Sequence, residues 1–554
     1  MRRGHYLNQM AAEAELNTSA SHRRSGSGRR SLQRALLLWL PTGLVLAAVL
    51  LPLLYLILRA AQGGQDTLDL LLRDRTLGIL GNSLALAGSV AGASAIIATG
   101  YGWLTIRTDI PGRRWLQLLG PLPLVIPSYV GAYLLAGALG PRGLVQGWLE
   151  NLIGVQRLPD IYGFPGAFLA LTLLSYPYVL LPVQAALNRM DPALEESARS
   201  LGLGPVATFL RVTLPLLRPA LTGGVLLVAL YSLRDFGAVS IMRFTTFTRA
   251  VYIQYQSAFD RSTAAALALV LVVISLLLMS LEIRTRPVER ERYAQERSES
   301  QRLTRIKLGS WRWPAFLLCA GLLSLALLLP AGVLGYWLVR GIQSQQQLMP
   351  IFDATRNSLI ASALAAVITL AFALPVAVLL SRRSGRRIRW IERVSHLGFA
   401  LPGIVIALSL VFFGARYAPI LYGSLPMLLL AYAILFLPQA TGSVRTSLLQ
   451  VPNSLHEAGL SLGRSPIAVF RKVTLPLIQP GMLAGLALVF LTAMKELQAT
   501  LLLSPLGFET LATQVWSAVS EAFFAQAAAP ALVLLLTSSV PMAILVFGQR
   551  IKES

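Results

Sequence analysis

The chain has 554 residues, of which 55% are hydrophobic and 13% are charged, and its net charge is +23. A soluble domain normally has about 25% charged residues, so this composition excludes an ordinary water-soluble protein and favours a chain with lipid as its solvent. The single cysteine, Cys319, excludes an intrachain disulfide. The four histidines are scattered without the spacing of metal ligands. The sequence therefore predicts no resident metal and no other cofactor.

Long uncharged segments recur along the whole chain. A helix needs about 20 apolar residues to cross a hydrocarbon layer about 30 Å thick. We predict an all-α polytopic membrane protein with twelve transmembrane helices, six on each side of a charged break. The predicted spans are 35–58, 76–106, 115–141, 161–188, 219–242, 262–281, 313–339, 357–381, 394–415, 417–444, 473–494 and 522–549.

Polar segments flank and divide these spans. Residues 1–34 are rich in Ser and Arg and lack a packing pattern, which predicts a disordered cytoplasmic tail. Residues 284–311 mix both signs of charge and are expected to form a solvated cytoplasmic linker. This division leaves two transmembrane domains, 35–283 and 312–549, and a short cytoplasmic C-terminus, 550–554.

The basic residues are distributed unevenly between the two sides of the predicted spans. With residue 1 in the cytoplasm, 35 of the 48 Lys and Arg residues fall on the cytoplasmic side. The positive-inside rule then places both termini in the cytoplasm of a multi-pass protein. The same distribution argues against nucleic acid as a partner, because the charge is spread over short loops beside helices, where anionic lipid attracts it.

A repeat relates the two halves of the chain. Leu194–Leu221 and Leu455–Met482, 261 positions apart, share 14 of 28 aligned residues. Similar stretches surround Pro127 and Pro402, which are 275 positions apart. Because six spans separate corresponding points, the halves share one orientation and are related by an axis along the membrane normal.

Each copy of the repeat predicts a short helix that ends at a glycine, Gly202 or Gly463, because glycine adopts the left-handed conformation that ends helices. A second helical piece with an apolar face follows, and prolines then turn the chain into the next span. We call each of these helix–turn–helix segments, Leu194–Leu221 and Leu455–Met482, an elbow. Two cytoplasmic elbows are suited to binding two copies of a partner. A re-entry elbow that is repeated only through gene duplication remains the alternative.

The sequences "ESARSLG" and "EAGLSLG", each followed by "TLP", resemble the EAA loop of ABC importer permeases with MetI-like, type I transmembrane domains. The resemblance covers about 76–281 and 357–548. It implies that a short coupling helix in each loop docks onto a cytoplasmic ATPase. The coupling residues that it implies are Glu196, Ser197, Ala198 and Gly202, and Glu457, Ala458, Gly459 and Gly463.

The fused, two-domain arrangement is similar to that of bacterial ferric-iron permeases. Asp235–Arg261 and Lys495–Trp516 look like the segments that follow the fifth span in that subgroup. Fused thiamine permeases share the architecture, so thiamine or another small solute remains an alternative substrate. The resemblance implies two cytoplasmic ATP-binding subunits, a periplasmic or extracellular substrate-binding protein, and a location in the bacterial inner membrane.

Charged pairs interrupt the fifth and eleventh spans at corresponding positions, Arg234-Asp235 and Lys495-Glu496. Charges within lipid are costly and usually face a partner or a pathway. We expect Asp235 and Glu496 to line the transport route, where carboxylate oxygens suit a hard cation such as Fe³⁺. The alternative is that the neighbouring charges neutralise one another and help packing.

The chain contains no G-x-x-x-x-G-K-[ST] phosphate cradle, so we expect a separate subunit to hydrolyse ATP and the chain itself not to be an enzyme. A twelve-span secondary transporter is a rival hypothesis, although most of the spans carry no charge. A membrane-bound transferase would need a carboxylate or histidine cluster at one membrane face, and the sequence shows none.

Overall fold

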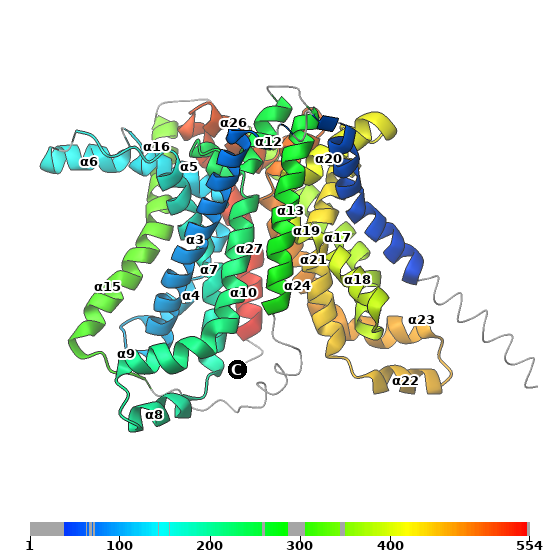
Figure 1. Cartoon of the computed structure of the whole chain (residues 1–554), viewed down its shortest axis with the longest axis horizontal. Coiled ribbons are helices and arrows are strands. Elements are labelled where there is room, and N and C mark those ends of the chain that lie inside the picture. The colour runs from blue at the N-terminus through cyan, green and yellow to red at the C-terminus, as the bar shows by residue number, and fades with distance from the viewer. Residues whose placement is uncertain are drawn as a thin grey trace, which may run out of the picture.

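The computed structural model describes residues 38–62, 64–65, 69, 72–141, 143–154, 156–256, 261–285, 305–343 and 350–550. The predicted tail 1–34, most of the predicted linker and residues 551–554 lie outside this set. Within it every regular element is a helix (Figure 1). The predicted all-α fold is therefore confirmed.

Nine helices of the described residues are long and apolar enough to cross a membrane, or eleven if each of two bent helix pairs counts as one span. The nine are Leu38–Gln62, α3 (Asp74–Arg107), α7 (Phe164–Arg189), Pro205–Arg234, Ser262–Leu281, Gly309–Gln343, α17 (Ile351–Arg382), α21 (Leu425–Leu449) and Pro466–Met494. The last predicted span corresponds to α27 (Phe524–Arg550).

The third predicted span of each half is not one straight helix, and this part of the prediction is wrong. In the first half, Arg113–Val125 is followed by Ser128–Ile153 at an angle of 101°, and in the second half Arg386–Ala400 is followed by Gly403–Tyr417 at the same angle. The cause is a proline at each bend, because the residue before a proline avoids the helical conformation. Ile126 and Leu401 are both extended, with ψ of 118° and 120°. The helices directly before and after the first bend are η1 (Leu122–Val125) and α5 (Ser128–Leu139). Those before and after the second bend are α19 (Leu397–Ala400) and α20 (Gly403–Tyr417).

The fifth predicted span, 219–242, also differs from the structure. One helical segment runs from Pro205 to Arg234 through α9 (Pro205–Thr208), the π-turn η2 (Phe209–Thr213) and α10 (Leu214–Arg234). Pro215 lies directly after the wider π-turn, and the helix continues past it. Figure 1 shows α9 lying across the lower end of the bundle and α10 rising from it. The second helical piece of the elbow, α9, and the fifth span are therefore one continuous helical segment that changes direction.

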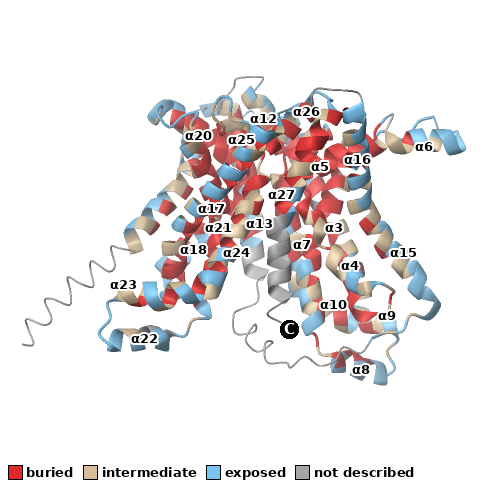
Figure 2. Cartoon of the chain, turned by 180° about the vertical axis from the view of Figure 1, so that it is seen from behind, coloured by how far each residue is buried: buried red, intermediate tan, exposed pale blue. Residues whose placement is uncertain are grey.

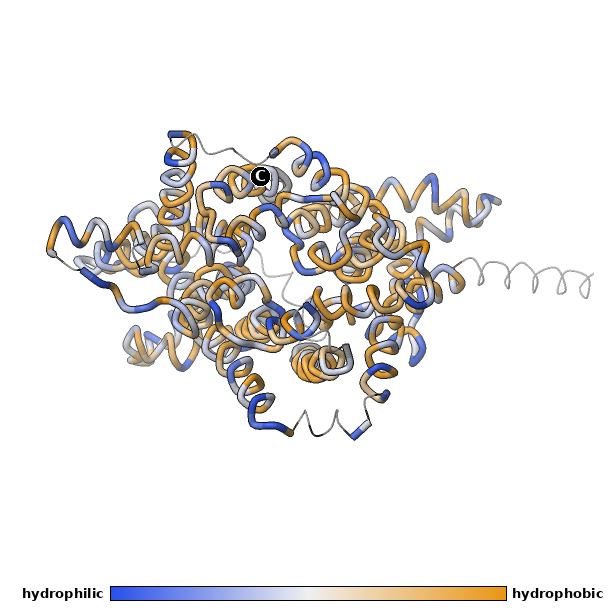
Figure 3. Tube along the Cα trace, turned by 90° about the horizontal axis from the view of Figure 1, so that it is seen from above, coloured by the Kyte–Doolittle hydropathy of each residue, from blue (hydrophilic) through white to orange (hydrophobic). Residues whose placement is uncertain are grey.

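The second half repeats this arrangement with α23 (Pro466–Val469), η5 (Phe470–Thr474) and α24 (Leu475–Met494). Each half is built around three mutually packed helices, α3, α7 and α10 in one and α17, α21 and α24 in the other. Figure 2 shows buried residues concentrated where these helices meet. Seen from above, apolar positions dominate the helices of the bundle (Figure 3).

The two halves exchange their first spans. The helix Leu38–Gln62 packs against the second half, with Tyr55 against Phe412 at a ring distance of 6.2 Å and Trp39 beneath the guanidinium of Arg383. The seventh span, which contains α15 (Arg312–Leu323) and α16 (Leu329–Gln343), packs against α4 (Arg113–Leu119) and α5 of the first half. This exchange adds to the contacts between the halves that α27 makes with η1 and α5.

Candidate functional site: two exposed elbows and a cavity between the halves

The two repeated elbows lie at the same end of the molecule. Their short helices, α8 (Pro192–Ser200) and α22 (Asn453–Ser461), project below α9 and α23 (Figure 1). We call this end the elbow end. Gly202 and Gly463, which follow the two helices, have φ of 86° and 75°. This left-handed conformation favours glycine, so the predicted helix stops are confirmed.

The small residues of the motif differ in what they face. Ala198 is buried, and Gly459 at the corresponding position lies so close to α23 that a Cβ there would be 2.8 Å from Cγ2 of Val469. A small residue is therefore needed at this position for the elbow to fold back on itself. The other six candidate coupling residues are exposed: Glu196, Ser197, Gly202, Glu457, Ala458 and Gly463. The structure thus presents both glutamates on the surface of the elbow end.

A buried ion pair, which the sequence pattern does not reveal, supports the first elbow. Glu195 lies within 3.7 Å of Arg107 at the end of α3, and both side chains are buried. The hydroxyl of Thr213 in η2 donates a hydrogen bond of 2.7 Å to the same carboxylate. Glu195 therefore connects α8 to α3 and to the base of α10. In the second repeat the corresponding position is His456, so the sequence repeat itself gives no signal for this contact.

The second candidate site is a cavity of about 440 Å³ between the two halves. Both halves line it, and the structure brings together the two charged pairs that interrupt the fifth and eleventh predicted spans. The charged residues of the lining are Arg234, Asp235, Lys495 and Glu496. Arg234 is the last residue of the helical segment Pro205–Arg234, and Lys495 directly follows Pro466–Met494. Each elbow is therefore connected by one helical segment to the cavity wall.

The two carboxylates each lie two residues before a short helix and accept a hydrogen bond from its first turn. Asp235 Oδ1 accepts a hydrogen bond of 2.9 Å from the backbone N–H of Ala238 in α11 (Gly237–Ile241), and Glu496 Oε1 accepts one of 3.1 Å from the N–H of Ala499 in α25 (Gln498–Leu503). An acidic side chain at this position satisfies an otherwise unpaired N–H and interacts favourably with the helix dipole. Asp235 and Glu496 therefore have matching structural roles beside the cavity.

The two cations do not pair with the carboxylates next to them within the part of the chain that the structure describes. Arg234 instead donates a 2.7 Å hydrogen bond to the carbonyl of Phe399, and Lys495 donates a 3.0 Å hydrogen bond to the carbonyl of Leu124. These carbonyls lie just before the proline bends of the opposite half, where helical partners run out. Phe399 and Leu124 are 275 positions apart, so the two contacts are symmetric equivalents. We call them the crossed anchors.

One side chain makes the cavity asymmetric. Gln498 donates a 2.8 Å hydrogen bond to the carbonyl of Arg234 and accepts one of 3.0 Å from the N–H of Ile404. The repeat places Gly237 at the corresponding position, where a Cβ would be 2.7 Å from Cβ of Tyr129. The first half therefore has no room for an equivalent glutamine. No group of three or more His, Cys, Asp or Glu residues that would hold a metal ion occurs among the described residues.

Replacing Glu195 tests its supporting role. We expect Glu195→Ala to lower the thermal unfolding midpoint of the purified protein by several degrees, because removing one partner of a buried ion pair costs about 3 kcal/mol. Glu195→Gln retains an acceptor for Thr213 and should lower the midpoint less. The adjacent exposed change Glu196→Ala is the matched control and should leave the midpoint within about 1 °C. Equal effects of the two alanine variants would contradict a special role for Glu195.

Comparison with known proteins agrees with this architecture. Residues 98–282 and 371–553 each match the family described as "Binding-protein-dependent transport system inner membrane component". The chain is 36% identical over 498 residues, 89% of its length and 95% of the relative's, to the Fe(3+)-transport system permease protein FbpB 2 of Haemophilus influenzae.

Two further relatives show how far the similarity extends. The ferric transport system permease protein FbpB of Actinobacillus pleuropneumoniae is 25% identical over 85% of this chain and 70% of its own length. The molybdenum transport system permease protein ModB of Escherichia coli is 36% identical over 25% of this chain and 59% of its own length. The chain therefore belongs to the family of binding-protein-dependent transport system inner membrane components and is a fused permease with two MetI-like domains.

Proposed function

We propose that this permease forms the transmembrane pathway of an ABC importer for ferric iron and that two ATP-binding subunits dock on α8 and α22. The observation that carries this proposal is the pair of exposed elbows at one end of the molecule, each continued by a helix that reaches the cavity between the halves. Two equivalent elbows suit two copies of one motor subunit. The ferric substrate is supported by the names of two relatives that the chain matches over most of its length.

The proposed orientation places the elbow end and both termini in the cytoplasm of a bacterial cell. Its support is the excess of Lys and Arg on that side of the spans. The substrate-binding protein would then dock at the opposite end, which carries α12 (Phe247–Gln256) and α26 (Leu511–Ser520). The inner membrane fits the family description.

The proposed mechanism follows from the continuity of the helices. When the ATPases close, they pull α8 and α22 towards each other, and α10 and α24 carry this displacement to Arg234 and Lys495 at the cavity. The ion pair between Glu195 and Arg107 transmits the same movement to α3. ATP shifts the equilibrium only if it binds one of the two access states more tightly than the other.

Asp235 and Glu496 are proposed to face the substrate as well as to accept hydrogen bonds from the first turns of α11 and α25. Both line the cavity, and carboxylate oxygens suit a hard cation. With two cations and two carboxylates in its lining, the cavity has no net formal charge. A passing Fe³⁺ would therefore interact with individual carboxylates rather than with a strongly negative field.

Loss of the two exposed glutamates tests ATPase docking. We expect the Glu196→Ala/Glu457→Ala protein to capture the cognate ATP-binding subunit about tenfold less well or worse, because each lost charged hydrogen bond is worth about 1.5 kcal/mol or more. Co-purification on a tagged permease measures the effect. Glu150→Ala, at an exposed position of α6 (Leu144–Ile153), is the control. Undiminished capture by the double variant would rule out docking through these residues.

The variant Glu496→Gln tests the pathway. The glutamine oxygen still accepts the hydrogen bond from Ala499, so the helix start is retained and only the charge is lost. We expect ferric-iron uptake by proteoliposomes that contain the assembled importer to fall about tenfold, while ATPase capture is unchanged. Glu150→Gln, at an exposed position of α6, should transport at the wild-type rate. Wild-type uptake by Glu496→Gln would remove this residue from the pathway.

A further inference from the structure

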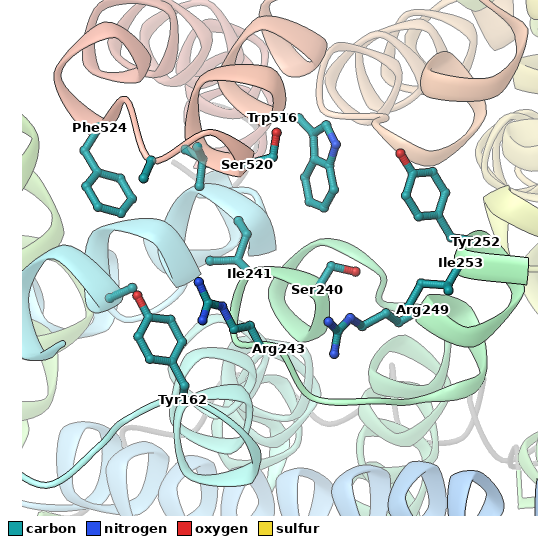
Figure 4. Close-up of a pocket in the computed structure, with 13 residues that line it drawn as sticks. Tyr162, Ser240, Ile241, Arg243, Arg249, Tyr252, Ile253, Trp516, Ser520 and Phe524 are labelled. Atoms are coloured by element: carbon teal, nitrogen blue, oxygen red, sulfur yellow. The ribbon is translucent and has the colours of Figure 1, made fainter. Parts of the chain in front are cut away.

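A second cavity, of about 420 Å³, lies at the end of the molecule opposite the elbows. It is formed between α11 and α12 of the first half and α26 and α27 of the second (Figure 4). Aromatic side chains make up much of its wall: Tyr162, Tyr252, Trp516 and Phe524. Figure 4 shows Arg243 and Arg249 across the cavity from Trp516 and Phe524. A volume of this size is in the range of small-molecule sites.

The two arginines give the cavity an unbalanced positive charge. None of the described residues that line it is acidic. Arg243 lies over the ring of Tyr162 at 5.1 Å, and Arg249 makes a long hydrogen bond of 3.4 Å to Thr245. Neither arginine forms an ion pair with any described carboxylate. Burial and the nearby charge of Arg243 lower the pKa of Arg249, as expected where two cations lack a counterion.

Arg243 is held in a backbone conformation that its residue type disfavours. Its φ is 56°, at the end of α11, where Phe244 N–H bonds the carbonyl of Val239 and Arg243 N–H bonds that of Ser240. This is the helix-end position at which glycine is usual. A side chain kept at such a strained position is often functional.

The second half has glycine at the matching position. Asn82 bonds the carbonyl of Thr245, and Asn357 bonds that of Glu509, so this part of the repeat has an offset of 264. The offset pairs Arg243 with Gly507, whose φ is 75°. It also pairs Arg249 with Thr513. The arginine pair is therefore present in one half only.

We propose that this cavity binds one small organic oxyanion, a carboxylate or phosphate compound with an apolar body. The guanidinium groups of Arg243 and Arg249 hold the anionic group, because guanidinium donors match the geometry of carboxylate and phosphate oxygens. Trp516, Tyr252 and Phe524 enclose the apolar part. This cavity shares no lining residue with the cavity of the proposed pathway, and the inference does not depend on the ferric substrate.

The test uses the full-length permease in lipid nanodiscs and isothermal titration calorimetry. The probes are phenylphosphate, inorganic phosphate and choline, which is a small organic cation. We expect one phenylphosphate to bind per chain, inorganic phosphate to bind about tenfold more weakly because it lacks the apolar body, and choline not to bind. Failure of phenylphosphate to bind, or equally tight binding of inorganic phosphate, would overturn the proposal.

The matched variant is Arg243→Gly, which gives the first half the residue that the second half already has. Because glycine suits the backbone there, we expect the unfolding midpoint to stay at or above the wild-type value while phenylphosphate affinity falls at least tenfold. Arg249→Gln should weaken binding similarly. Arg416→Gln, at an exposed position of α20, should bind as the wild type does. Wild-type affinity in the stably folded Arg243→Gly protein would contradict the assignment.

Discussion

The crossed anchors are the contacts on which the rest of the structure depends. Each joins the basic residue at the end of one half's fifth helix to a carbonyl at the proline bend of the other half, Arg234 to Phe399 and Lys495 to Leu124. A charged side chain inside a membrane protein is costly unless it has a partner, and a bent helix leaves carbonyls without partners. Each hydrogen bond gives the basic side chain an acceptor and the carbonyl at the bend a donor. Because both hydrogen bonds cross the interface, they join the two halves beside the cavity.

This arrangement explains how a force at one end could reach the cavity. The helical segments Pro205–Arg234 and Pro466–Met494 begin beside the elbows and end at the anchors, so they connect the proposed motor contacts to the cavity wall. The exchanged first spans hold the halves together at their periphery. Under the proposed mechanism, the two halves rock against each other, as in other transporters built from repeats that alternate access.

Much of this organisation could be predicted from the sequence, because lipid requires long apolar helices and duplication repeats its signals. The helix stops at Gly202 and Gly463 follow from backbone sterics alone. The broken third spans were missed, although Pro127 and Pro402 marked them, because hydropathy alone does not register a bend. Glu195 could not be distinguished from its neighbour Glu196, since only the folded chain brings Arg107 to one of them. The crossed anchors likewise depend on contacts between distant segments.

Thermal unfolding of the purified permease with Arg234→Met and Lys495→Met, singly and together, tests the crossed anchors most directly. Each change leaves a part-buried carbonyl without its donor, which costs about 1 kcal/mol or more. Both single variants should therefore unfold several degrees below the wild type, and the double variant lower still. Arg218→Met and Lys472→Met, at exposed positions of the same two helical segments, are the controls and should change the midpoint little. Anchor variants that unfold no earlier than these controls would contradict the account.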